Sequence, residues 1–60
     1  MSIREIRKSK GLTMLQVAQR VGVSEAMISL IERKVRVPSV KLAKKLAPIY
    51  EVDWMFFFQE

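Results

Sequence analysis

The basic side chains of this sequence have the plainest chemistry, because cations bind anions. Arg33, Lys34 and Arg36 stand close together ahead of Pro38. The whole chain of 60 residues carries 11 Lys+Arg against 6 Asp+Glu, a net charge of +5. This balance favours a nucleic acid or an anionic membrane surface as partner, and a solvated basic loop is the plain alternative. The three basic residues are therefore candidate contacts to phosphate groups.

Catalysis and metal binding have few residues to use. The chain has no Cys and no His, which removes the commonest general base and the commonest metal ligands. It also lacks a pair of carboxylates at a useful spacing and a glycine-rich phosphate loop. We therefore predict that the chain is not an enzyme, and we expect no cofactor and no metal. No small-molecule substrate is evident.

Five helices and no strand are predicted as the elements that must position these residues. A chain of this length is one domain, residues 1–60. Each segment begins at a capping side chain, and most end near glycine or proline. Pro48 predicts a kink or a stop in the fourth helix, because its missing N–H leaves a carbonyl unpaired. The segments are Ser2–Ser9, with Glu5 completing a capping box; 14–21 after Thr13; 24–33 with Ser24 as cap; a fourth after Ser39; and 54–58 after Asp53.

The segment from Thr13 to Glu32 meets the demands of two short helices that cross steeply through a tight turn. Close approach needs a small residue on the first helix, and Ala18 supplies it. The turn needs a residue that tolerates positive φ, and Gly22 supplies it. The second helix needs branched apolar residues facing inward, and Ile28 and Ile31 supply them. Together these positions predict a helix-turn-helix.

The sequence resembles the phage repressor and Cro-type (XRE-like) helix-turn-helix family over nearly its whole length. The resemblance is carried by "IREIRKSKGLT", "VAQRVGVS", "ISLIER", "RVPSVKLAKKLA" and "VDW". It implies an all-α fold, a compact five-helix bundle of the lambda-repressor-like DNA-binding type. It also implies a small transcriptional regulator, a repressor, that binds double-stranded operator DNA as a homodimer. The helix around 24–33 would then enter the major groove.

Several residues take roles from this resemblance. Arg7 stands where the family has an arginine that pairs with the glutamate ending the reading helix, here Glu32. Thr13 and the amides after it stand at the phosphate-contacting start of a helix, which suits an anion. Two residues depart from the family. Met14 stands where glutamine is usual and removes a side-chain donor. Lys34 stands where glycine is common, so it either adopts a left-handed backbone at some cost or the helix ends differently.

The face predicted to read base pairs is unusual. With the two isoleucines inward, it carries Ser24, Glu25, Ala26, Ser29 and Leu30. Bidentate readout of guanine or adenine from its centre is therefore excluded. Ala26 and Leu30 could pack on thymine methyl groups, Glu25 could accept from a cytosine amino group, and the serines could bond a base edge or phosphate.

A second interpretation is that this face binds protein, so that the helix-turn-helix scaffold serves as an interaction or dimerisation module. Met14, Leu15, Met27 and Leu30 would then form an exposed apolar patch, of the kind that marks interfaces. Ordinary partial burial of Met27 beside the core is the alternative for that residue.

The C-terminal segment raises the question of dimerisation. Val52, Trp54, Phe57 and Phe58 match core positions of the family, whereas Met55 and Phe56 fall where the family is usually polar. We expect Met55 and Phe56 to help form a homodimer interface, with a frayed end or a covered patch as the alternatives. The longest apolar run, "WMFFF", is too short to span a bilayer, and no segment resembles a targeting signal. A cytoplasmic protein without a membrane partner is expected.

Overall fold

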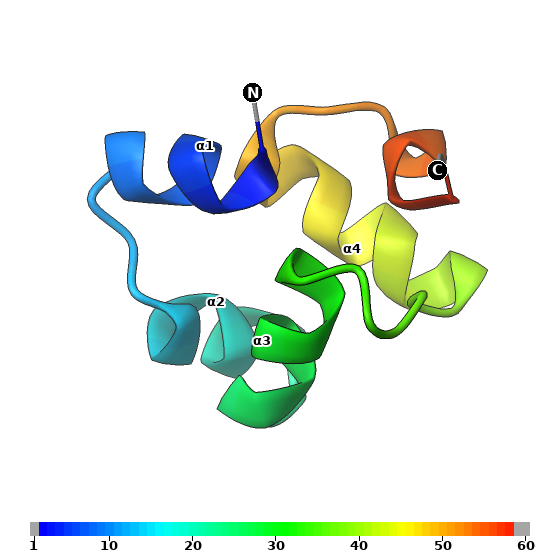
Figure 1. Cartoon of the computed structure of the whole chain (residues 1–60), viewed down its shortest axis with the longest axis horizontal. Helices are drawn as coiled ribbons and strands as arrows, with labels where there is room; N and C mark the ends of the chain where they lie inside the picture. Colours follow the sequence, from blue (N-terminus) through cyan, green and yellow to red (C-terminus); the bar gives the residue numbers. More distant parts are fainter. Residues whose placement is uncertain (1, 59–60) are drawn as a thin grey trace.

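Residues 2–58 are described by the structure, a computed structural model, and they form four α-helices and a short 3₁₀ helix without any β-strand (Figure 1). The elements are α1 (Ile3–Ser9), α2 (Met14–Val21), α3 (Glu25–Glu32), α4 (Val40–Tyr50) and η1 (Trp54–Phe58). The all-helical fold class is confirmed. The expected fifth α-helix is instead η1, where the Asp53 carbonyl accepts the Phe56 N–H at 2.9 Å, the three-residue spacing of a 3₁₀ turn.

Hydroxyl side chains cap the start of every α-helix. The capping residues are Ser2, Thr13, Ser24 and Ser39, and each side-chain oxygen accepts the N–H three residues further on, at 3.1–3.2 Å. All four caps are confirmed, as is the capping box of Ser2 and Glu5. Gln16 closes a second box that we did not predict, because its side chain accepts the Thr13 N–H at 2.8 Å. Caps of this kind stabilise each helix start by about 1 kcal/mol.

The helix ends depend on left-handed backbone. Gly22 ends α2 at φ 75°, as predicted, and its N–H bonds the Ala18 carbonyl. The fourth helix departs from expectation, since it continues two residues past Pro48 and ends where Glu51 takes φ 57°. Pro48 and Lys44 are both exposed, so the carbonyl that the proline leaves unpaired lies on the solvent side of α4.

Lys34, just past α3, also adopts left-handed backbone at φ 61°. A side chain in this conformation costs roughly 1–2 kcal/mol, which glycine avoids. We expect Lys34→Gly to raise the free energy of unfolding by roughly 0.5–1 kcal/mol after the larger entropy of glycine in the unfolded chain is subtracted. Urea denaturation is the measurement.

Lys34→Ala is the matched control, because it removes the same charge and keeps the strain. Equal stability of the two variants would show that the backbone of Lys34 costs nothing. Glu51→Gly is a poorer test, since Glu51 also pairs with Lys10 at 2.7 Å.

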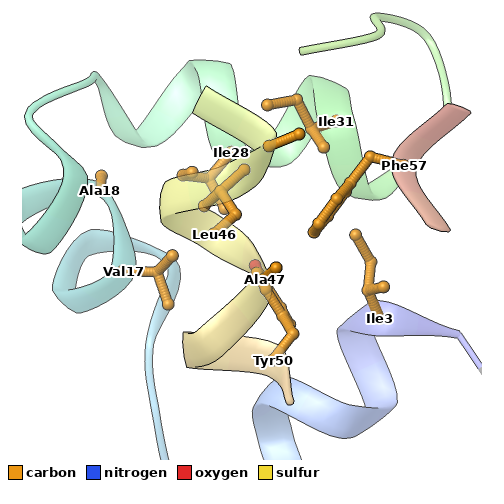
Figure 2. Packing of buried hydrophobic residues seen from close by; sticks show 10 residues of the cluster. Ile3, Val17, Ala18, Ile28, Ile31, Leu46, Ala47, Tyr50 and Phe57 are labelled. Atoms are coloured by element: carbon orange, nitrogen blue, oxygen red, sulfur yellow. The ribbon is translucent and has the colours of Figure 1, made fainter. Parts of the chain in front are cut away.

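The hydrophobic core lies around α4, which contacts α1, α2 and η1, while α3 packs on α2 (Figure 1). Figure 2 shows core side chains converging from all five elements. Ala18 and Ala43 are fully buried and let the helices approach closely. The buried apolar residues are Ile3, Val17, Ala18, Ile28, Ile31, Ala43, Leu46, Ala47, Tyr50 and Phe57.

The C-terminal element corrects one core prediction. Phe58 was expected inside, and it is 40% exposed. A 3₁₀ helix has three residues per turn, so residues three apart share a side. Trp54 and Phe57 therefore face the core, while Met55 and Phe58 share an outer side. Phe56 is half-buried and packs against the core.

Candidate nucleic-acid interface

The turn between α2 and α3 is held by hydrogen bonds and by burial. The N–H groups of Gly22 and Val23 both bond the Ala18 carbonyl, at 2.9 and 3.0 Å. Ala18 and Ile28 bring the two helices together with almost no exposed surface. The geometry of a helix-turn-helix is thus fixed from within, and the other side of α3 is left free.

All five residues predicted to read bases are accessible. Ser24, Glu25 and Ala26 are exposed, and Ser29 and Leu30 are partly exposed. Ser24 caps α3 by accepting a hydrogen bond from the Met27 N–H, so its own O–H remains available to donate. This face can therefore offer one carboxylate, two hydroxyls and apolar contacts.

The start of α2 offers backbone donors. Thr13 and Gln16 satisfy each other's N–H groups, which leaves those of Met14 and Leu15 without a hydrogen-bond partner among residues 2–58. The side chain of Met14 is partly buried and packs against the core. Any anion contact at Met14 is therefore through its backbone rather than through its side chain.

The basic loop after α3 is held in place by α3 itself. The N–H groups of Val35 and Arg36 both bond the Leu30 carbonyl, at 3.0 and 3.2 Å, and the Lys34 N–H bonds the Ile31 carbonyl. Arg33, Lys34 and Arg36 are all exposed. Within the described part of the chain, none of the three forms an ion pair.

A buried polar network fixes the end of α3. Arg7 is only 6% exposed, and it donates to both carboxylate oxygens of Glu32, at 2.7 and 3.2 Å. It also donates to the Leu12 carbonyl at 2.8 Å. The hydrogen bond to the Glu32 carboxylate raises the pKa of Arg7. The contact expected between Arg7 and Glu32 is present, and it joins α1 to α3.

Tyr50 completes this network, and the sequence gave no sign of its partner. Its hydroxyl donates to Glu32 at 2.9 Å from the last turn of α4. Burial raises the pKa of the Tyr50 hydroxyl, so it stays a neutral donor. Its place follows from the helical spacing of Leu46, Ala47 and Tyr50 on the inner side of α4, but the role of the phenol does not.

The chain matches the HTH_3 helix-turn-helix family over residues 3–57, from the first residue of α1 almost to the end of η1. It belongs to this family.

Relatives of this HTH_3 domain share its helix-turn-helix. The uncharacterized HTH-type transcriptional regulator YqaF of Bacillus subtilis is 33% identical, over 97% of this chain and 76% of its own length. The HTH-type transcriptional regulator SinR of Bacillus subtilis is 31% identical, over 85% of this chain and 47% of its own. The crystal structure of an HTH_3 family transcriptional regulator from Vibrio cholerae superposes with a TM-score of 0.70 and 38% identity, covering 93% of this chain and 32% of that one.

The HTH_3 domain brings Arg4 to the interface, a residue that the motif did not mark. Arg4 lines a hollow of about 280 Å³ together with Met14 from α2 and Ser29 and Arg33 at α3. The start of α2, the outer face of α3 and the first turn of α1 therefore adjoin one another. None of the described helices of this HTH_3 domain is long and apolar enough to cross a membrane.

The apolar patch that would favour a protein-binding scaffold is smaller than expected. Met14 and Met27 are partly buried and pack against the core of the HTH_3 domain. Leu15 is exposed and Leu30 is partly exposed, so these two leucines are what remains of the patch.

Proposed function

We propose that this chain binds double-stranded DNA as a small transcriptional regulator, with α3 in the major groove. The observation that carries the proposal is the adjacency of three anion-seeking features around α3. They are the free N–H groups at the start of α2, the unpaired cations of the loop at Arg33, Lys34 and Arg36, and the two arginines around the smaller hollow. Phosphate contacts of this kind supply much of the affinity for DNA.

The bases are read by the outer face of α3. Ala26 and Leu30 contact thymine methyl groups, and Glu25 accepts from a cytosine amino group. Ser24 and Ser29 donate to a base edge or a phosphate. Thr13 and the Met14 N–H hold a phosphate at the start of α2, and the loop cations hold the next ones. Discrimination between bases is expected to be modest, because the face carries no side chain for bidentate readout of a purine.

A salt titration of binding to a random duplex tests this function. We expect affinity to fall steeply and linearly on a double-logarithmic plot as salt rises, because phosphate contacts release counterions. Fluorescence anisotropy of a labelled duplex is the measurement. Failure to bind any duplex at low salt would overturn the proposal.

A homodimer through η1 accompanies this function. The described residues extend 24 Å at most, so one copy cannot place reading helices in two successive major grooves about 34 Å apart. Met55 is 54% exposed and carries most of the interface, and Phe56 adds the part of its ring left outside the core.

Met55→Glu is expected to abolish dimerisation, because a carboxylate would be buried without a partner. Sedimentation equilibrium should then give the monomer mass, while wild-type protein gives twice that mass at the same concentration. Val40→Glu is the control, since Val40 is a similarly exposed apolar residue outside η1. An unchanged mass for Met55→Glu would place the interface elsewhere.

A further inference from the structure

A hollow of about 520 Å³ opens on the side of the domain formed by the start of α1, the end of α3 with its loop, and η1. Figure 2 shows three of its residues, Ile3, Ile31 and Phe57, on one side of the core and coming from these three elements. Its size falls within the range of small-molecule sites, which are mostly apolar with a few placed polar groups. The apolar lining consists of Ile3, Ile31, Val37, Phe56, Phe57 and Phe58.

The polar groups of this apolar hollow leave a positive charge unbalanced. Glu32 lines it, but both of its carboxylate oxygens are held by Arg7, and one also accepts from Tyr50. Lys34 and Arg36 also line it, and neither forms an ion pair within residues 2–58. An apolar floor with two free cations complements a molecule with an apolar body and an anionic head.

We propose that the apolar hollow binds a small amphipathic anion, a carboxylate on a hydrocarbon or aryl body, and that this anion weakens DNA binding. The body packs on the phenylalanines and Val37, and the carboxylate meets Lys34 and Arg36. The second half rests on the proposed function, because the same two cations are there assigned to DNA phosphates. A carboxylate and a phosphate cannot both take the same donors.

A second copy of the chain fits this hollow less well. In a two-fold dimer the same patch contributes from both sides. Closing the apolar hollow in this way would bring Lys34 and Arg36 of one copy towards the same residues of the other, in a chain of net charge +5. Met55, the most exposed apolar residue of η1, does not line the hollow.

Decanoate is the probe for this site. Trp54 is the only tryptophan, and its ring meets Phe58 edge to face at 5.9 Å, so its fluorescence reports on the wall of the hollow. We expect saturable binding of decanoate below its micelle concentration. Decanol, which lacks the charge, and acetate, which lacks the body, should each bind at least tenfold more weakly.

Val37→Ser places the site, and Val40→Ser is its matched control. Both valines are well exposed, so neither change threatens the fold, and only Val37 lines the hollow. Val37→Ser should weaken decanoate binding roughly three- to tenfold through lost apolar contact. Val40→Ser should bind decanoate as wild type does.

Duplex binding in the presence of decanoate tests the coupling. Saturating decanoate should raise the dissociation constant for DNA at least fivefold, and DNA should weaken decanoate by the same factor, because coupling between two ligands is reciprocal. In Val37→Ser the same decanoate concentration should have less effect.

Each contrary result overturns a defined part of the proposal. Absence of saturable decanoate binding, or equal loss in both valine variants, overturns the site. Equal binding of decanol overturns the role of the cations. Unchanged duplex affinity with decanoate bound overturns the coupling. If no duplex binds even without decanoate, the proposed function fails, and the fluorescence titration still decides the site.

Discussion

Replacing Arg7 with alanine is expected to lower the free energy of unfolding by about 3–5 kcal/mol, since it leaves a buried charge without its partner. The Glu32 side chain is only 3% exposed, and Arg7 supplies two of the three hydrogen bonds to its carboxylate. A domain of this length has a total stability of roughly 3–9 kcal/mol, so much of the variant should be unfolded at room temperature.

Circular dichroism during urea denaturation measures this loss for Arg7→Ala. Arg4→Ala is the control on the same helix, and because Arg4 is exposed its effect should stay within about 0.5 kcal/mol. Tyr50→Phe gives a graded second measurement, with an expected loss of roughly 1–2 kcal/mol for the single hydrogen bond. A loss for Arg7→Ala no larger than that of Arg4→Ala would mean that the buried pair does not hold the fold.

Removing the charge of the basic loop is expected to have the largest effect on DNA binding. Changing Arg33, Lys34 and Arg36 together to glutamine should weaken binding to every duplex roughly 10²–10⁴-fold, because each charged contact contributes on the order of 1–2 kcal/mol. The slope of affinity against salt should fall by about three, one for each phosphate released.

A charge-matched variant separates the basic loop from overall charge. Changing Lys8, Arg20 and Lys45 to glutamine removes the same three charges from exposed positions on three other helices, outside the proposed interface. This control should lose far less affinity. Equal losses in the two triple variants would show that net charge alone holds the duplex, and that the loop has no particular role.

The helices could be read from the sequence because their limits are local. A hydroxyl cap such as Thr13, or a residue free to take positive φ such as Gly22, acts within a few positions, so the sequence alone places it. The inward spacing of Ile28 and Ile31 follows from the period of the α-helix. The extension of α4 past Pro48 was not predicted, because it depends on which side of the helix the unpaired carbonyl faces.

The features that the sequence did not predict depend on a change of period or on contacts between distant elements. Phe58 was placed in the core by α-helical spacing, and the tighter 3₁₀ period turns it outward. Tyr50 meets a carboxylate 18 positions earlier, across α3 and α4. Arg4 reaches the interface because α1 packs beside α2 and α3. No local pattern encodes such neighbours, whereas the contact of Arg7 with Glu32 came from the resemblance to a family.

The hydrogen bonds of Arg7 also bear on how the domain opens. A seven-residue helix at the end of a chain would ordinarily fray, and its amides would exchange with solvent long before the rest. Opening α1 here would strip Glu32 of its cation while the carboxylate is still enclosed by α3 and α4. The slowest amides of α1 should therefore exchange through global unfolding, at the same rate as those of α4, so that the first helix and the reading helix are lost in one cooperative step.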